Sequence, residues 1–163
     1  MKYIQKNGLN ATRVEDPSKL AATLICKGET LAWMQGKLEF GPRALGHRSL
    51  IGDPRTKKVR DQLNVIKQRE NWRPIAPSII ESTKKYFDSK YGMEYMTCTI
   101  KMNSLAMSEI PGAIHVDKTA RVQIVKDKED TYYQLIKEFE KKTGVPAILN
   151  TSLNKRGEPI CTS

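Results

Sequence analysis

The pattern that most constrains the fold lies near the end of the sequence, where a helix leads directly into a buried strand. Gly144 predicts the end of that helix, and the apolar run 145–150 predicts the strand. The helix itself is indicated by four apolar residues spaced i, i+3, i+4 and i+7, which are Tyr132, Leu135, Ile136 and Phe139. This pair predicts a domain in which helices cover a sheet.

Shorter patterns predict the other elements. A capping carboxylate at Asp16 followed by Pro17 predicts a helix that Gly28 closes. Apolar residues at helical spacing predict a second helix over 57–66, with Lys67 at its C-terminal end. Strands are expected over four further segments, 31–35, 75–80, 94–102 and 120–125.

The remaining segments carry weaker signals. Ser82 is expected to cap a short helix, and 36–54 and 103–118 are expected to be mostly loop. The expected fold class is therefore mixed α/β, of the α+β type, with roughly five to seven strands and about four helices.

Length and composition exclude several classes of protein. A chain of 163 residues is long enough for one domain with its own core. It contains no run of 18 apolar residues and no apolar stretch at the start, so neither a membrane helix nor a signal peptide is expected. Three cysteines without CxxC spacing are expected to be small buried apolar residues, and they fit a reducing, cytoplasmic setting.

Positive charge is concentrated in one stretch of the sequence. Of the formal net charge of +10, the window 43–73 carries +6, because it holds nine Lys and Arg residues and only three acids. A local excess of this kind predicts an anionic partner, such as a nucleotide, an acyl phosphate or nucleic acid.

The first block of interest within this window is FGPRALGHRS, residues 40–49. Gly41 and Gly46 allow the backbone to approach a ligand, and Arg43 and Arg48 offer planar forks suited to phosphate or carboxylate. The block is not a P-loop, because no GxxxxGK[ST] pattern is present. A tight structural turn with its arginines in solvent remains the alternative.

A second block, KQRENWRP, holds three cations at even spacing. In an extended segment Lys67, Arg69 and Arg73 would all point the same way. Pro74 favours that reading, because it disfavours helical backbone at the preceding residue. The block therefore predicts either a cationic ligand face or an ordinary solvated surface.

Two further blocks supply polar groups. In HVDKTARVQ, Arg121 is the better candidate ligand group and His115 is expected to be structural, since no metal-binding spacing surrounds it. In NTSLN, Ser152 and Asn154 follow the buried strand 145–150, where ligands of open α/β sheets usually bind. Their neutral groups suit a carbonyl, an amide or a ribose, and a simple capped turn is the alternative. A nucleophilic role for Ser152 is not expected, because no Gly-x-Ser-x-Gly elbow surrounds it.

Taken in order, the four blocks resemble the C-terminal, YrdC-like domain of the NodU/TobZ family of O-carbamoyltransferases. The resemblance runs from about Leu20 to the end, and the Lys-x-Arg and Ser-x-Asn pair is shared with the YrdC-like domains of HypF and threonylcarbamoyl-adenylate synthases. It implies a YrdC-like twisted mixed β-sheet with flanking helices around a basic concave cavity.

The resemblance also implies a reaction. A YrdC-like domain of this family uses ATP and carbamoyl phosphate to form carbamoyl-adenylate, releasing pyrophosphate and phosphate. An N-terminal domain of the actin/sugar-kinase type then transfers the carbamoyl group to an acceptor hydroxyl compound. The chain is accordingly expected to be a fragment of a longer protein that holds only the adenylate-forming half, and its acceptor is not indicated.

Site residues follow from the same resemblance. It implies catalytic roles for Lys67, Arg69 and Arg121, and it assigns substrate or nucleotide binding to Arg43, Arg73, Ser152 and Asn154. Magnesium would accompany ATP and be held by its phosphates, with no metal ligated by the protein. The sequence departs from the family pattern at Lys118, where glycine is common.

A second reading is a YrdC-like module that binds double-stranded RNA or a nucleotide without catalysis. The sequence disfavours nucleic acid, because the cations cluster with Gly, Ser and Asn loops and aromatic residues make up only 7% of the chain.

Overall fold

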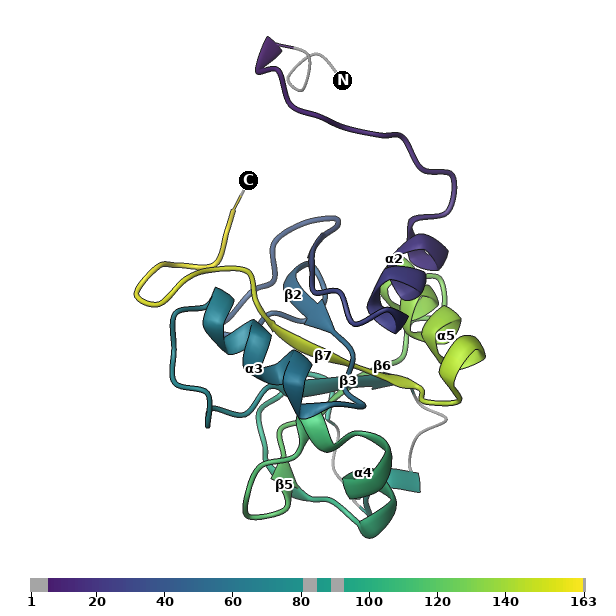
Figure 1. Ribbon diagram of the computed structural model, residues 1–163, viewed down its shortest axis with the longest axis vertical. Coiled ribbons are helices and arrows are strands. Elements are labelled where there is room, and N and C mark those ends of the chain that lie inside the picture. The colour runs from purple at the N-terminus through teal and green to yellow at the C-terminus, as the bar shows by residue number, and fades with distance from the viewer. Residues whose placement is uncertain (1–5, 81–84, 89–92, 163) are drawn as a thin grey trace.

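A five-stranded mixed sheet forms the centre of the molecule (Figure 1). The computed structural model describes residues 6–80, 85–88 and 93–162. Within the sheet β3 and β6 are parallel, and every other neighbouring pair is antiparallel. In spatial order the strands are β1 (Leu31–Met34), β2 (Arg48–Gly52), β7 (Ala147–Ser152), β3 (Ala76–Ile80) and β6 (Gln123–Val125). The mixed α/β prediction is confirmed.

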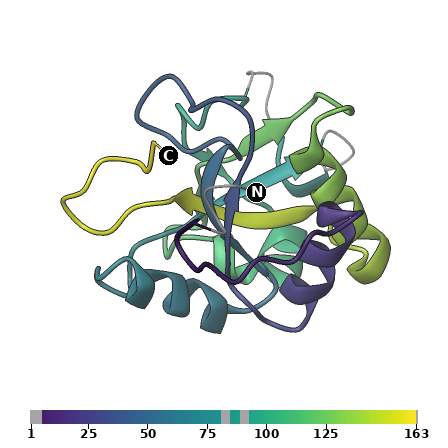
Figure 2. The same cartoon turned by 90° about the horizontal axis from the view of Figure 1, so that it is seen from above.

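Helices flank this sheet on both sides. In two perpendicular views α2 (Pro17–Cys26) and α5 (Thr131–Thr143) lie side by side, with α3 (Lys57–Ile66) on the other side of the molecule (Figures 1 and 2). A smaller layer holds α4 (Ser104–Glu109), the 3₁₀ turn η2 (Pro111–Ala113) and the pair β4 (Ile100–Lys101) and β5 (Thr119–Ala120). Among the described residues no helix has both the length and the apolar character needed to cross a membrane.

Helix α5 matches its sequence prediction. The Asp130 carboxylate accepts a hydrogen bond from the Tyr132 amide at 2.7 Å and so caps the first turn. Gly144 ends the helix with a left-handed φ of 75°, a conformation that glycine adopts without strain. The four residues at helical spacing are the buried ones, which confirms the predicted core face.

Helix α2 begins as predicted, and it buries mainly small residues. Asp16 accepts from the Lys19 amide at 2.9 Å. The buried residues are Ser18, Ala21, Ala22 and Ile25, whereas Leu20 is 43% exposed. Small residues allow α2 to approach α5 closely, and the Ser18 hydroxyl donates to the Thr131 carbonyl at 2.9 Å.

Three sequence expectations are wrong in detail. The segment 36–54 contains β2, which is buried along its whole length between β1 and β7. Only Ile100–Lys101 of the expected strand 94–102 is strand, and the expected loop 103–118 contains α4 and η2. Helix α4 begins there because the Asn103 side chain accepts from the Ala106 amide at 3.0 Å.

Smaller differences concern single residues. The expected strand 120–125 is split, with Arg121 lying between β5 and β6. Cys98 is exposed, and Cys26 and Cys161 are half-buried, so the expectation of buried cysteines is wrong. The cap predicted at Ser82 lies outside the described residues.

Candidate anion-binding site

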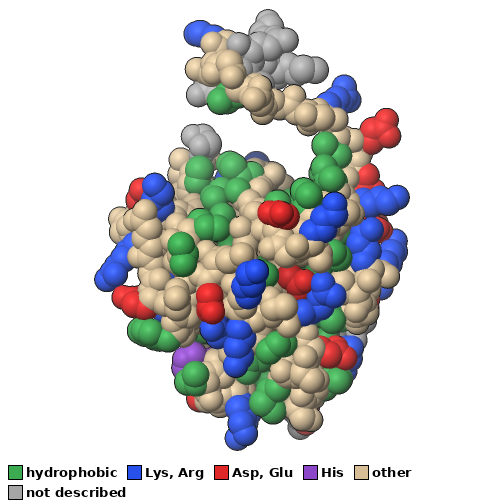
Figure 3. All heavy atoms as spheres, in the orientation of Figure 1, with side chains coloured by type: hydrophobic (Ala, Val, Ile, Leu, Met, Phe, Trp, Pro, Cys, Tyr) green, Lys and Arg blue, Asp and Glu red, His purple; other side chains and the backbone are tan. Residues whose placement is uncertain are grey.

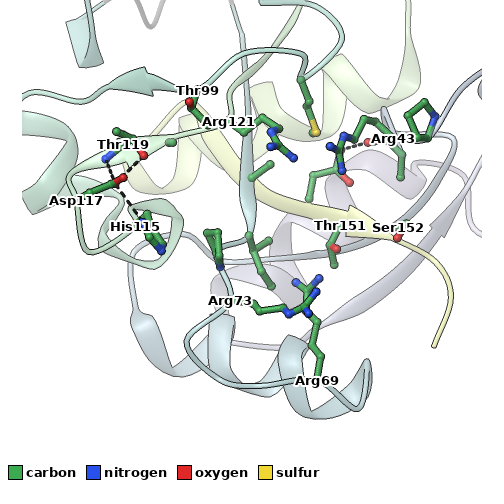
Figure 4. Close-up of a pocket in the computed structure, with 18 residues that line it drawn as sticks. Arg43, Arg69, Arg73, Thr99, His115, Asp117, Thr119, Arg121, Thr151 and Ser152 are labelled. Carbon is green, nitrogen blue, oxygen red and sulfur yellow. Dashed lines mark hydrogen bonds and ion pairs between the residues drawn. The ribbon is translucent and has the colours of Figure 1, made fainter. Parts of the chain in front are cut away.

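A cavity of about 490 Å³ opens where the ends of β7 and β3 meet the loop 40–47. Figure 4 shows arginine side chains entering it from several separate elements. On its other side the wall is formed by the turn between η2 and β5. Residues predicted from sequence that line the cavity are Arg43, Arg69, Arg73, Arg121 and Ser152.

Four of these residues, Arg43, Arg69, Arg73 and Arg121, form what we call the arginine wall. Burial and the neighbouring Arg121 cation lower the pKa of Arg43, and burial and Arg73 lower the pKa of Arg69. In Figure 4 the Arg43 and Arg121 side chains approach one another at the top of the cavity, and Arg69 and Arg73 lie together below. Like charges held this close favour an anion between them.

Two guanidinium nitrogens of the arginine wall are buried without a hydrogen-bond partner. They are Nη2 of Arg69 and Nε of Arg121. The remaining contact of Arg69 is structural, since its Nε donates to Asn64 Oδ1 at 2.6 Å. A buried charged donor without an acceptor is costly, so these positions are suited to ligand oxygens.

Lys67 occupies a different environment from the arginines. Its side chain is 5% exposed and does not line the cavity. Its ammonium instead donates to the Ser152 carbonyl at 2.6 Å and hydroxyl at 3.2 Å, and to the Asn154 carbonyl and Oδ1, each at 2.8 Å. We call Lys67, Ser152 and Asn154 the lysine cluster.

The lysine cluster is closed by a further bond, because the Ser152 hydroxyl donates to Asn154 Oδ1 at 2.5 Å. Three ammonium hydrogens facing four oxygens leave Lys67 with no free donor. Burial and the Arg69 cation lower the pKa of Lys67 to about 8. Of the three members only Ser152 lines the cavity, so the cluster fixes that hydroxyl from behind.

The backbone between Lys67 and Arg73 is a turn, so the predicted extended segment is wrong. Gln68 has a left-handed φ of 53°, and the Arg69 amide donates back to the Asn64 carbonyl. The Asn64 side chain stabilises the turn, donating to the carbonyls of Asn71 at 3.1 Å and Arg73 at 3.0 Å. The turn sends Arg69 and Arg73 to the cavity and Lys67 to the lysine cluster.

The loop 40–47 is fixed by a carboxylate that precedes it. Glu39 Oε1 accepts the backbone amides of Leu45, His47 and Arg48 at 2.7–3.1 Å. Although burial raises the pKa of Glu39, hydrogen bonds from the backbone outweigh that effect and lower it. Arg48, one of the two candidate ligand forks of this block, donates to the carbonyls of Gln35, Gly36 and His47 and is a structural residue.

Sequence reasoning missed a polar group at the base of the cavity. We call Ser78, Gln123, Asn150 and Tyr132 the buried polar network; the first three lie on adjacent strands and the fourth on α5. Asn150 Nδ2 lies 3.0 Å from Ser78 Oγ, from Gln123 Oε1 and from the Ala44 carbonyl. Asn150 and Ser152 point the same way along β7, so strand alternation was the available signal.

His115 and Asp117 form the opposite rim. Asp117 accepts from the Thr119 amide and hydroxyl and lies 3.1 Å from His115 Nδ1, as the dashed lines of Figure 4 mark. Lys118 has a left-handed φ of 65°, a conformation that the glycine expected at this position from the family resemblance would adopt without strain. These bonds are local and support the structural reading of His115.

Comparison with known proteins identifies the family. The family described as carbamoyltransferase C-terminus matches residues 22–163. The chain belongs to this family. The nodulation protein NolNO of Sinorhizobium fredii is 40% identical over 93% of this chain and 23% of its own length. The 3'-hydroxymethylcephem-O-carbamoyltransferase of Amycolatopsis lactamdurans is 41% identical over 82% of this chain and 26% of its own length.

Two facts qualify this relationship. The chain spans about a quarter of the length of the curated relatives it matches, between 23% and 29% for the first three. Among solved structures, full-length HypF in its phosphate- and nucleotide-bound form has a TM-score of 0.64 over 94% of this chain and 19% of that chain. At 20% sequence identity this likeness shows the fold, and it confirms the YrdC-like prediction.

Proposed function

We propose that this domain binds ATP and carbamoyl phosphate in the cavity and forms carbamoyl-adenylate. The observation that carries the proposal is the pair of unpartnered guanidinium nitrogens on Arg69 and Arg121. Buried cationic donors with no protein acceptor are suited to oxygen atoms from a ligand, and phosphate groups supply these in a geometry that the planar guanidinium recognises.

The reaction that we propose joins two anions. Carbamoyl phosphate releases phosphate on reaction with water, and the resulting carbamate oxygen attacks the α-phosphorus of ATP, with pyrophosphate as the leaving group. Both steps concentrate negative charge on oxygen, so positioning and charge neutralisation supply most of the catalysis. The arginine wall would neutralise that charge, and Ser152, held by Lys67, would hydrogen-bond the carbamoyl or AMP portion.

Magnesium enters this proposal as part of the substrate. Among the described residues there is no group of three or more His, Cys, Asp or Glu side chains placed to bind a metal ion. The cavity is lined by arginines and hydroxyl groups, with Asp117 already hydrogen-bonded to Thr119. The ATP phosphates would therefore hold Mg²⁺, which prefers oxygen ligands and retains its own waters.

Transfer of the carbamoyl group to its acceptor would be carried out by another domain of a longer protein. HypF in the structure named above binds phosphate and nucleotide. The cephem relative is named for transferring a carbamoyl group to an oxygen, and this chain matches only 26% of it. Four exposed apolar side chains lie within two residues of cavity-lining residues in the sequence and would suit such a domain: Phe40, Trp72, Tyr95 and Val116.

The surface gives less support to the RNA-binding reading. On the face shown in Figure 3, Lys and Arg side chains are interspersed with Asp and Glu side chains. A basic stripe that follows a nucleic acid backbone would be continuous. A steep fall of affinity with salt would be the mark of RNA binding.

Titration calorimetry of the full chain with Mg²⁺-ATP and with carbamoyl phosphate tests the proposal. We expect both to bind, and expect Arg121→Ala to weaken each about 100-fold, because a buried charged donor contributes about 2–5 kcal/mol when its partner is present. Arg60→Ala is the matched control, since Arg60 pairs with Asp61 away from the cavity.

A pyrophosphate-release assay with both ligands then tests catalysis. Absence of binding to chain that circular dichroism shows to be folded would refute the proposal. Binding of ATP with no pyrophosphate formed in the presence of carbamoyl phosphate would reduce it to nucleotide binding alone.

A further inference from the structure

Asn150 is the most buried polar side chain that lines the cavity, at 1% exposure. It lies on β7 two residues before Ser152, opposite Ala76 of β3. Its amide nitrogen has three oxygen neighbours, whereas its amide oxygen Oδ1 is buried with no hydrogen-bond partner. This imbalance asks for an explanation, because buried acceptors are normally paired.

The orientation of the Asn150 amide is fixed by neighbours that can only accept. The Gln123 Nε2 donates to the Leu45 carbonyl at 2.8 Å, so Gln123 Oε1 must face the other way. Asn150 Nδ2 lies 3.0 Å from that oxygen and 3.0 Å from the Ala44 carbonyl. Exchanging the nitrogen and oxygen of Asn150 would place acceptor against acceptor at both contacts.

Hydroxyl directions in the network agree with this assignment. Ser78 Oγ donates to Gln123 Oε1 at 2.6 Å and receives the Tyr132 hydroxyl at 2.9 Å. Every donor and acceptor of Ser78 and Gln123 that faces Asn150 is then committed. No rotation within the network supplies a hydrogen for Asn150 Oδ1, so its donor has to come from outside the network, and Asn150 lines the cavity.

The ligands of the proposed reaction differ in what they can offer. The arginine wall presents only donors, which suit the oxygens of any acyl phosphate or nucleotide. A carbamoyl group differs from an acetyl group in one respect relevant here, namely an NH₂ that donates two hydrogen bonds. A fixed acceptor beside a wall of donors can therefore recognise the carbamoyl end and reject its methyl analogue.

We infer that Asn150 Oδ1 accepts a hydrogen bond from the carbamoyl NH₂ and so selects carbamoyl phosphate over acyl phosphates that lack this donor. This inference rests on the proposed function, because it assumes that carbamoyl phosphate occupies this cavity. Asn150 is in this view a specificity-determining residue whose own amide nitrogen is held by the network.

The test compares carbamoyl phosphate with acetyl phosphate, which has a methyl group in place of NH₂. For the unsubstituted chain, calorimetry should give a dissociation constant for acetyl phosphate about 10- to 100-fold higher, as expected for one buried hydrogen bond. Asn150→Leu should reduce the ratio of the two constants to about 1, while inorganic phosphate binding is retained.

Ser78→Ala is the matched control, because it removes a neighbour of Asn150 Nδ2 and leaves Oδ1 unchanged. It should keep the preference for carbamoyl phosphate even if both affinities fall. Loss of the preference in Ser78→Ala to the same extent as in Asn150→Leu would show that the network's shape, and not Oδ1, selects the ligand.

The outcomes also separate this inference from the proposed function. If carbamoyl phosphate does not bind the folded chain, the proposed function fails. If it binds with the same affinity as acetyl phosphate, only the role of Asn150 fails. The ligand comparison uses the unsubstituted chain, so equal affinities for the two ligands would overturn the inference even if Asn150→Leu does not fold.

Discussion

The lysine cluster and the arginine wall lie side by side, yet their hydrogen bonding is opposite. Lys67 is surrounded by four oxygens of Ser152 and Asn154. Arg69, only two residues later, keeps a buried nitrogen without an acceptor. A buried cation with all its donors satisfied maintains structure, whereas one left unsatisfied is available to a ligand.

The largest expected effect is on stability, and it tests whether the lysine cluster maintains the structure. Lys67→Met removes the ammonium and keeps a similar stem, leaving the oxygens of the lysine cluster without their donor. We expect the free energy of unfolding to fall by about 3 kcal/mol, measured by urea denaturation. Arg121→Gln should not lower the free energy of unfolding, because it removes a buried charged donor that has no acceptor in the protein.

The opposite pattern would overturn this comparison. If Lys67→Met unfolds at the same urea concentration as the parent chain but no longer binds ATP, Lys67 acts on the ligand directly. Equal losses of stability in both variants would mean that the arginine wall is as structural as the lysine cluster.

A smaller effect concerns pH. Because the pKa of Lys67 is lowered to about 8, the ammonium loses its proton within an accessible range, while ATP keeps a constant charge above its phosphate pKa near 6. Protonated Lys67 favours an anion nearby, so affinity should fall as pH rises. We expect ATP to bind about fivefold more weakly at pH 9 than at pH 7 by calorimetry.

In Lys67→Met this pH dependence should be absent, provided that the variant is folded at both pH values. The same fivefold decline in the variant would assign the titration to another group and would remove Lys67 from the electrostatics of the cavity.

The smallest effect lies on the opposite rim, at Lys118. Its left-handed φ of 65° strains any residue that carries a Cβ. Lys118→Gly should raise the free energy of unfolding by about 0.5 kcal/mol, after the greater flexibility of glycine in the unfolded chain is deducted. The readout is the melting temperature, expected to rise by about 1–2 °C. Lys118→Ala removes the charge but keeps the Cβ, so a gain there would show that charge is the cause.

Long, regular elements could be predicted from the sequence because their signals are local. The helix α5, its Gly144 terminus and the following strand β7 all follow from spacing and capping. Strand β2 could not be predicted, since it is short and its first residue is Arg48. That arginine is tolerated in a buried strand because the carbonyls of Gln35, Gly36 and the preceding His47 accept its hydrogens.

The residue types in the sequence were enough to find candidate site residues. They were not enough to predict the hydrogen-bond partners of those residues. Arg43, Arg69, Arg73 and Arg121 lie around one cavity. Whether a cation is satisfied depends on oxygens far away in sequence, such as those that surround Lys67. Asn150 was missed for the same reason, because the residues that hold its amide, Ala44, Ser78 and Gln123, come together only in the fold.

Gly46 lies against the ring of Tyr132, and this contact bears on how a ligand enters. A Cβ at Gly46 would overlap the ring, which is itself buried in the core. The loop 40–47 is also tied to the sheet, because Gln123 donates to the Leu45 carbonyl and Asn150 to the Ala44 carbonyl, so moving it outward would break buried hydrogen bonds. Residues 116–118 of the opposite turn are exposed, and apart from the bond of the Met102 amide to the Lys118 carbonyl the turn is held by bonds within itself, so its displacement costs less. Ligands should therefore enter and leave the cavity past the turn 115–119, while the loop 40–47 stays in place.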